Sequence, residues 1–147
     1  MKKNNRINNN WIVGFVIIVV IISGILLYEY YIKNQQFEKY DDPKLDNLKN
    51  RLSNVFPEIN HIELSGSNKS FTINKKEIYL CLKDKNGNYY DDNMLIYVLL
   101  HELAHVKCDE IGHTEKFKSI FKSLLQKAEL AGIYNPYQPP IDNYCNF

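Results

Sequence analysis

A long uncharged apolar segment near the beginning of the sequence restricts what the chain can fold into. Residues 11–28 read WIVGFVIIVVIISGILLY, which is 18 residues without a charged side chain. As a helix with a rise of about 1.5 Å per residue, the segment spans about 27 Å, close to the roughly 30 Å hydrocarbon core of a bilayer. Aromatic residues, which favour membrane interfaces, stand at both ends: Trp11, then Tyr28, Tyr30 and Tyr31. We therefore predict a single transmembrane anchor over residues 11–32.

A cleaved signal peptide and a buried core helix are the two alternatives for this segment. A signal peptide has a shorter apolar core of about 7–15 residues and a cleavage site of small residues, whereas Ser23-Gly24 lies inside the run. A retained anchor, with the lipid bilayer as partner, is the favoured interpretation. More basic residues precede the segment than closely follow it, which favours an N-terminus in the cytosol: Lys2, Lys3 and Arg6 come before it, Lys33 and Lys39 after it.

The charge balance of the remaining chain argues against nucleic acid as a partner. The chain has 18 Lys and Arg and 17 Asp and Glu, of which three basic residues and Glu29 lie in residues 1–32. Residues 33–147 therefore hold 15 basic and 16 acidic side chains, a net charge of −1. Nucleic-acid-binding domains usually carry a basic excess, so no nucleic acid is expected here.

Apolar periodicity predicts an α+β domain over residues 43–147. It follows a polar segment (residues 1–10), the anchor and a polar linker (residues 33–42). The expected elements are a helix over 43–55, strands at 61–64, 71–73 and 77–82, and helices over 94–108 and from Thr114 to about Gly132. A hairpin turn is expected at residues 74–76.

The helix over residues 94–108 combines an apolar half with a histidine pair. Its first half, MLIYVLL, is apolar on every side, which is typical of a helix inside a domain. His101 and His105 are four residues apart, so one helix face presents both imidazoles to one zinc ion. Glu102 is turned by about 100° from His101 and can act as general base on a zinc-bound water. The alternative is a pair of satisfied core histidines with a salt-bridged glutamate.

A catalytic zinc site needs a third protein ligand and one open position. Asp109 continues the four-residue spacing, but on an unbroken helix its Cα lies about 12 Å along the axis from that of His101, too far to share an ion. His113 follows Gly112, which permits the chain to turn back. We therefore favour His113 over Asp109 or Glu110 as the third ligand.

HELAH and the residues after it resemble the zincin metallopeptidases of the SprT-like and WLM groups. These groups share HExxH and a third histidine followed four residues later by an aromatic, a pattern matched by His101, Glu102, His105, His113 and Phe117. The resemblance extends over about residues 77–131. The chain is also short and rich in Asn and Ile, and in this respect it resembles proteins of large DNA viruses that contain this core.

The resemblance implies a minimal zincin fold, with a small, mostly antiparallel sheet beside an active-site helix and a following helix. It implies zinc-dependent hydrolysis of a protein or peptide substrate with Glu102 as general base. The substrate is then expected to add to a sheet edge, with residues 77–82 as the edge strand. Phe117 is expected to be a packing residue, and three tyrosines are candidates for stabilising the oxyanion: Tyr134, Tyr137 and Tyr144.

The expected function is therefore that of a membrane-anchored zinc peptidase. SprT-like and WLM proteins act largely on DNA-bound proteins, a role that the anchor and the charge balance do not match. One alternative is a non-catalytic interaction module stabilised by zinc, with Cys108 or Asp109 as a fourth ligand. The other is a tethered protease that acts on DNA-associated proteins.

The remaining cysteines and histidine give weaker signals. Cys81, Cys108 and Cys145 are odd in number and form no CxxC motif, so a disulfide framework is not expected. Buried, hydrophobe-like cysteines are favoured, although one pair can form in an oxidising compartment. His61 has no partner at ligand spacing and is interpreted as a surface or structural residue.

Overall fold

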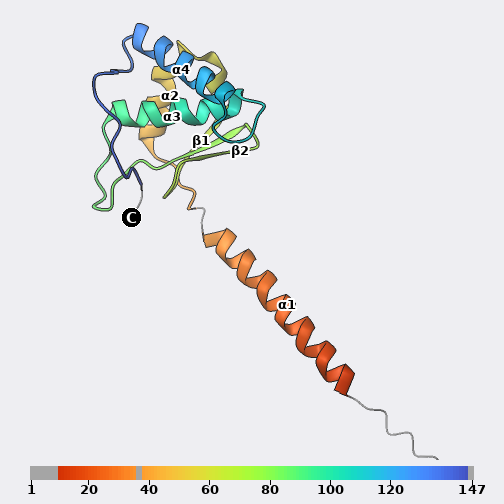
Figure 1. Ribbon diagram of the computed structural model, residues 1–147. Coiled ribbons are helices and arrows are strands. Elements are labelled where there is room, and N and C mark those ends of the chain that lie inside the picture. The colour runs from red at the N-terminus through yellow and green to blue at the C-terminus, as the bar shows by residue number, and fades with distance from the viewer. Residues whose placement is uncertain (1–9, 36–37, 146–147) are drawn as a thin grey trace, which may run out of the picture. The chain divides into compact units, whose positions relative to one another are not determined.

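The computed structural model describes residues 10–35 and 38–145 and divides the chain into two compact units (Figure 1). The first unit, up to residue 37, contains helix α1 (Asn10–Gln35). The second unit contains, in chain order, α2 (Pro43–Ser53), the 3-10 helix η1 (Pro57–His61), β1 (Glu63–Gly66), β2 (Phe71–Ile73), β3 (Glu77–Leu80), α3 (Asp92–Lys107) and α4 (Glu115–Leu130). This order of helices and strands confirms the α+β class.

Helix α1 is long and apolar enough to cross a membrane. Its apolar part, Trp11–Tyr30, has 20 residues and a mean hydropathy of 2.8, and none of it is buried. A helix of that length spans about 30 Å, the thickness of a bilayer core. Because these side chains are exposed, α1 is not a core helix of the described chain. The predicted apolar helix is confirmed, and a signal sequence passes the same test of length and composition.

The domain begins earlier than the sequence indicated. Tyr40, expected in a linker over residues 33–42, exchanges two backbone hydrogen bonds with Gly66 of β1. The Asp42 carboxylate caps α2 by accepting the Lys44 N–H at 3.0 Å. Residues 38–42 therefore belong to the second unit, while α1 extends to Gln35 at the other end of the expected linker. The polar segment expected at residues 1–10 lies outside the described residues, apart from the first residue of α1.

The sheet is mixed, with strand order β1-β3-β2. Strands β2 and β3 form the predicted antiparallel hairpin, in which Asn74 and Lys75 take φ of 49° and 57°, as a type I′ turn requires. Strand β1 pairs in parallel with β3, with Glu63 opposite Glu77. The expectation of a mostly antiparallel sheet is therefore wrong. The expectation of an edge strand at residues 77–82 is also wrong, because β3 lies in the centre.

Strand β3 takes the central position because its side chains are apolar on both faces. Ile78, Tyr79 and Leu80 are all buried, and Cys81 and Leu82 continue the buried run. A near-continuous apolar stretch is typical of a strand covered on both sides. The shorter strand β2 is only half-buried and forms an edge of the sheet.

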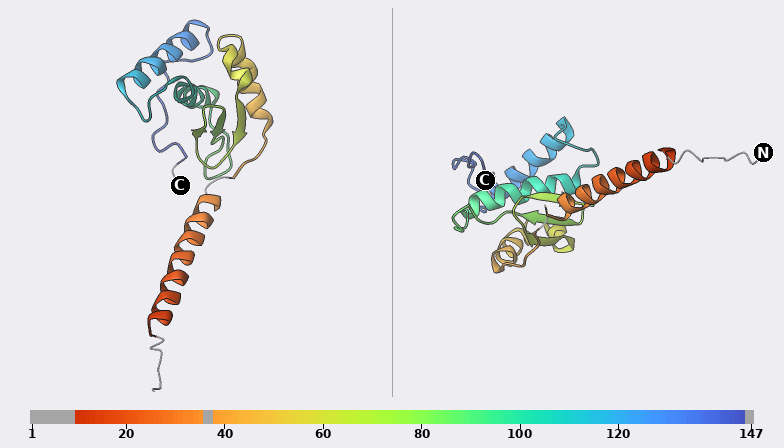
Figure 2. Two further views of the ribbon diagram at one scale, coloured as in Figure 1. Left: turned by 90° about the vertical axis from the view of Figure 1, so that its right-hand side faces the viewer. Right: turned by 90° about the horizontal axis from the view of Figure 1, so that it is seen from below.

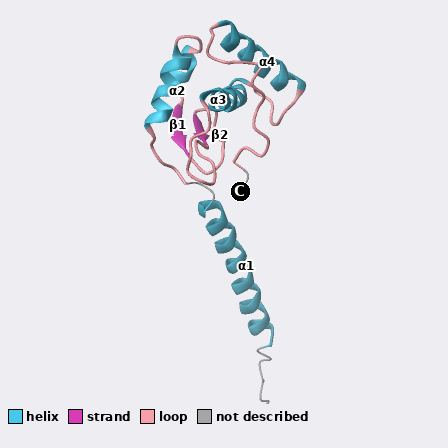
Figure 3. Cartoon of the chain, turned by 90° about the vertical axis from the view of Figure 1, so that its left-hand side faces the viewer, coloured by secondary structure: helices cyan, strands magenta, loops and turns pink. Residues whose placement is uncertain are grey.

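Helix α3 lies in the middle of the domain, in contact with the sheet, α4 and α2 (Figures 2 and 3). The Asp91 carboxylate caps it by accepting the Met94 N–H at 2.9 Å. Its first half is buried on every side, as predicted: Met94, Leu95, Ile96, Val98, Leu99 and Leu100. Helix α4 packs against it through Phe117, Leu124 and Ala128. This packing fixes the second half of α3, which carries the histidine pair, between α4 and β2.

Candidate metal centre

Three histidines come together at the C-terminal end of α3. The Nε2 atom of His113 lies 3.0 Å from that of His101 and 3.2 Å from that of His105. One ligand atom from each of the three lies within 4.8 Å of the others. Two nitrogens bound to one tetrahedral zinc at 2.0–2.1 Å are about 3.3 Å apart. The spacing of the three imidazoles therefore fits a shared zinc ion.

A sharp turn after α3 brings the third histidine back to the pair. Helix α3 ends at Lys107, and Cys108 is already extended, with its carbonyl accepting a hydrogen bond from Lys75 Nζ at 2.7 Å. Gly112 has φ of 85°, a left-handed conformation that favours glycine. Thr114 then caps α4, with its hydroxyl accepting the Phe117 N–H at 3.3 Å.

The other residues considered as ligands lie away from this cluster. The Asp109 side chain is 73% exposed and forms an ion pair with Lys116 at 2.6 Å, and Glu110 is exposed as well. Cys108 is fully buried. Among the described residues, the group of potential metal ligands consists of the three histidines. The structure thus places His113 beside the pair, and His61 stands on the surface of η1.

Phe117 packs against all three imidazoles. Its ring centroid lies 4.2 Å from that of His105, 4.8 Å from that of His113 and 5.0 Å from that of His101. Phe117 is 2% exposed, and the Phe121 ring adds an edge contact to His101 at 5.1 Å. These contacts hold the imidazole rings in place, in the packing role expected for Phe117.

The surroundings of His101 and His105 favour the neutral form of both imidazoles. Burial, together with the neighbouring His105 and His113, lowers the pKa of His101 to about 4. Burial and His113 also lower the pKa of His105. Neutral imidazole is the form that binds a metal ion, so the ligand nitrogens of His101 and His105 are available at neutral pH.

Glu102 is a buried carboxylate that pairs with a hydroxyl. It is 6% exposed, and the Thr72 hydroxyl of β2 lies 2.8 Å from its Oε2 atom as a hydrogen-bond donor. Burial raises the pKa of Glu102 to about 7, although the hydrogen bond from Thr72 acts to lower it. In the described chain, no basic side chain forms an ion pair with this carboxylate, so the salt-bridged alternative does not fit. A pKa near 7 suits a general base at neutral pH.

Two cavities meet at Glu102 and His101. One, of about 570 Å³, lies along β2 and is also lined by His105, Gly112 and His113. The other, of about 380 Å³, lies between the first half of α3 and the C-terminal tail, defined as residues 131–145. Ser70, from the loop before β2, lines both.

Of the three tyrosines in the tail, Tyr144 lies nearest to the site. It lines the smaller cavity together with Glu102, and its hydroxyl donates a hydrogen bond to the Cys81 carbonyl oxygen. Tyr137 is 91% exposed, and the Tyr134 ring stacks 6.2 Å from that of Tyr97.

Two of the three cysteines form a disulfide. Cys81, directly after β3, is bonded to Cys145 in the tail, and their Cα atoms are 6.3 Å apart. Cys108 is free and buried. All three cysteines are buried, as expected, and Cys108 alone is a buried free thiol, while Cys81 and Cys145 form the one pair that the sequence left open.

Several residues of the site have no signal in the sequence. Thr72 and Ser70 are short polar residues around a three-residue strand, and the pairing of Cys81 with Cys145 joins positions 64 residues apart. Their roles depend on how β2 and the tail pack on α3, and local patterns of residue type do not encode that packing.

The fold and the site define an α+β domain with a three-histidine cluster at the end of a buried helix, in a chain with an N-terminal apolar helix. The chain belongs to a family of viral proteins that includes Uncharacterized protein 136R of Invertebrate iridescent virus 6. Identity to 136R is 46% over 124 residues, covering 69% of this chain and 70% of the relative.

Two further relatives also come from viruses. Uncharacterized protein 042R of Invertebrate iridescent virus 3 is 45% identical over 94 residues, covering 63% of this chain and 57% of the relative. Uncharacterized protein R325 of Acanthamoeba polyphaga mimivirus is 36% identical over 135 residues, covering 88% of this chain and 67% of the relative. No protein-family model matches the chain, and no solved structure is significantly similar to it.

Proposed function

We propose that the protein is a zinc-dependent peptidase of the zincin type, held at a membrane by α1. The observation that carries the proposal is the convergence of three histidine Nε2 atoms beside the buried carboxylate of Glu102. His101, His105 and His113 would hold the ion. The cavities next to them leave one side of the cluster open, as a catalytic zinc site requires. The order of these residues, followed by Phe117, resembles that in SprT-like and WLM zincins.

The proposed reaction is the hydrolysis of a peptide bond by a water molecule. A zinc ion in this site would lower the pKa of a bound water to about 7 and polarise the substrate carbonyl. Glu102 accepts a proton from the attacking water and delivers it to the leaving amine nitrogen as the C–N bond breaks. Thr72 keeps the carboxylate oriented through its hydrogen bond to Oε2.

The proposed position of the substrate is along β2. Strand β2 forms an edge of the sheet, and the larger cavity lies between this strand and the three histidines. A peptide that adds to β2 as a further strand would gain backbone hydrogen bonds irrespective of its sequence. This arrangement replaces the edge strand first expected at residues 77–82.

The proposed location is a membrane, with the domain on the side away from the cytosol. The basic residues before α1 favour a cytosolic N-terminus, and the Cys81–Cys145 disulfide fits an oxidising compartment. Protease treatment of sealed membranes that carry the chain with a C-terminal tag tests this location. A protected tag is expected, whereas a tag that is digested in intact vesicles would place the domain in the cytosol.

The hydrolytic function is tested with the full chain in detergent, loaded with zinc. Release of peptides from an unfolded protein is measured for the wild type, Glu102→Gln and Glu58→Gln. We expect Glu102→Gln to lose at least about 100-fold in rate, the typical contribution of a general base. Glu58→Gln changes a glutamate on η1 that pairs with Lys107, and is expected to stay near the wild type. Equal rates for Glu102→Gln and the wild type would refute the proposal.

A further inference from the structure

The smaller cavity has a mostly apolar lining and lies directly beside the three-histidine cluster. Its volume is about 380 Å³, and its walls include Met94 and Val98 of α3 and Ile141 of the tail. It reaches His101 and Glu102, which together with Ser70 are the residues it shares with the cavity along β2. A peptide lying along β2 with its scissile bond at Glu102 would therefore have one neighbouring side chain in reach of this cavity.

The tail that forms the outer wall has no helix or strand and is held mainly at two places. Near its start, Asn93 and Asn135 exchange two hydrogen bonds, at 2.7 and 3.0 Å. At its end, the disulfide ties Cys145 to Cys81. Between these anchors, the Ile141 N–H contacts the Met94 sulfur at 3.3 Å, and thioether sulfur is a weak acceptor. The position of Ile141 in the wall thus depends on both anchors.

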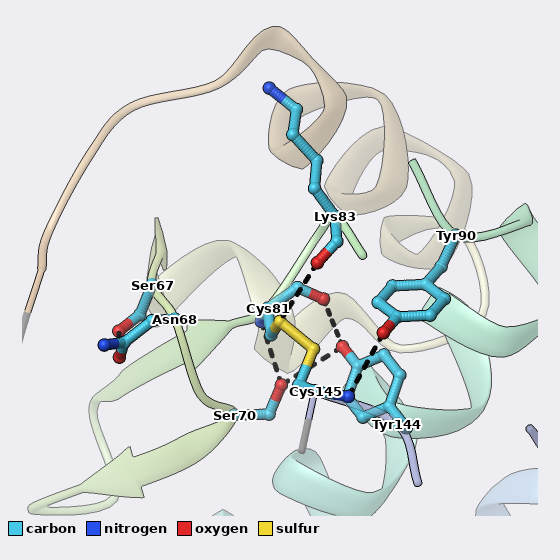
Figure 4. Close-up of a disulfide and its surroundings, with 8 residues drawn as sticks. All are labelled: Ser67, Asn68, Ser70, Cys81, Lys83, Tyr90, Tyr144 and Cys145. Carbon is cyan, nitrogen blue, oxygen red and sulfur yellow. Dashed lines mark hydrogen bonds between the residues drawn. A yellow bond between two sulfur atoms is a disulfide. The ribbon is translucent and has the colours of Figure 1, made fainter. Parts of the chain in front are cut away.

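The disulfide holds the end of the tail together with hydrogen bonds from Tyr144 and Cys145 (Figure 4). Tyr144 places its hydroxyl on the Cys81 carbonyl oxygen and 3.2 Å from Ser70 Oγ. Cys145 donates its backbone N–H to the Tyr90 hydroxyl at 3.1 Å. Cys145 also has φ of 53°, a left-handed conformation that is unfavourable for a residue with a Cβ. Without the covalent bond, the backbone at Cys145 can relax and withdraw Tyr144 from the wall.

We propose that this cavity binds one apolar side chain of the peptide substrate, next to the scissile bond, and that the Cys81–Cys145 disulfide assembles it. The inference rests on the proposed peptidase function, because it places the scissile bond at Glu102. It adds a substrate preference and a redox control of that preference. Reduction would open the wall formed by the tail, while the three histidines, which lie on α3 and the loop before α4, keep their positions.

The test measures binding to the full chain in detergent, with Glu102→Gln as a form that does not cleave. A library of unfolded peptides is first used to find the residues that the protein prefers. Digestion by the wild type gives the preferred residues around the cleavage position, and binding to Glu102→Gln gives those around the bound position. Two fluorescent peptides are then compared by anisotropy, with Leu or Asp at the position of strongest selection. We expect the oxidised protein to bind the Leu peptide at least about tenfold more tightly, since apolar pockets discriminate by that order.

The disulfide is removed in two ways, by reductant and by the double change Cys81→Ser, Cys145→Ser. Both are expected to reduce the preference for Leu to within about twofold, and the double variant should not respond further to reductant. A third variant, Ile141→Asp, keeps the disulfide but puts a carboxylate in the wall, and is expected to lose the preference as well. If the double variant does not fold, Ile141→Asp still tests whether the wall of the cavity sets the preference for Leu.

Equal binding of the two peptides by the oxidised protein would overturn the inference. A preference for Leu that survives both reduction and the double substitution would equally overturn it. Failure of the proposed function gives a different result: no zinc is bound and no peptide is cleaved. In that case the binding measurements on Glu102→Gln still decide whether the cavity takes an apolar side chain under control of the disulfide.

Discussion

Replacing Glu102 with glutamine tests whether the buried environment of this side chain disfavours the ionised form of its carboxyl group. Burial raises the pKa of Glu102 from 4.5 to about 7, against the opposing hydrogen bond from Thr72. The folded state therefore binds the proton more tightly than the unfolded state. The contribution of this group to stability is complete below about pH 4.5 and is lost as the pH rises through about 7.

The size of the effect follows from the two pKa values. A rise from 4.5 to about 7 corresponds to about 3 kcal/mol at pH values above both. Glutamine has nearly the same shape and can accept the hydrogen bond from Thr72, but it does not ionise. Metal-free Glu102→Gln is therefore expected to be more stable than the wild type by up to about 3 kcal/mol at pH 8, and by less than about 1 kcal/mol at pH 5. The low pKa of His101 makes both proteins less stable as the pH falls from 6.5 through 4, so it cancels in the comparison.

The assay is urea unfolding of the full chain in detergent with a chelator, followed by near-ultraviolet circular dichroism at pH 5 and pH 8. The control is Glu58→Gln. Burial acts to raise the pKa of Glu58, but the hydrogen bond and charge of Lys107, a backbone hydrogen bond and the charge of Lys127 together outweigh it, so the pKa is lowered. This control is expected to lose up to about 1 kcal/mol at pH 8, as for a partly exposed ion pair. If Glu102→Gln also loses stability at pH 8, Glu102 is an ordinarily paired charge and the reasoning is wrong.

Three further substitutions or treatments probe the packing around the site. Phe117→Ala removes a ring that contacts all three imidazoles. The change is expected to lower the free energy of unfolding in urea by about 3–5 kcal/mol and to weaken zinc binding. An unchanged stability would contradict the packing role. Thr72→Val removes the hydrogen bond that favours the charged form of Glu102. The acid limb of the pH–rate profile should therefore move to higher pH. A shift to lower pH would contradict the role of the Thr72 hydroxyl in lowering the pKa of Glu102. Reducing the disulfide, which links residues 64 apart, should lower the free energy of unfolding by about 4 kcal/mol, and a loss below about 1 kcal/mol would count against it.

Residue patterns in the sequence predicted the helices of the domain well. Apolar periodicity and the all-round apolar run before HELAH indicated α3 and α4 to within a few residues. The placement of His113 also followed from helix geometry, because a ligand inside the helix is too far from His101 and Gly112 permits a turn. These features depend on local spacing, which the sequence encodes directly.

The order of strands and the covalent link in the tail could not be predicted in the same way. Residues 77–82 were expected at the edge from the resemblance to zincins, and a hairpin alone does not tell which of its strands a third strand will join. The continuous apolar run in YLCL was the available sign that β3 lies in the centre. The pairing of Cys81 with Cys145, and the contact of Thr72 with Glu102, join segments far apart in the sequence. Tertiary packing decides such contacts.

Zinc-edge X-ray absorption spectroscopy of the purified full chain tests the central claim most directly, because it reports both the presence of the metal and its ligand atoms. The account predicts bound zinc with three imidazole nitrogens and one oxygen of a water molecule in its coordination shell. His113→Ala should then lose one nitrogen or the metal itself. A chain that binds no zinc, or a coordination shell that contains the sulfur of Cys108, would contradict the account.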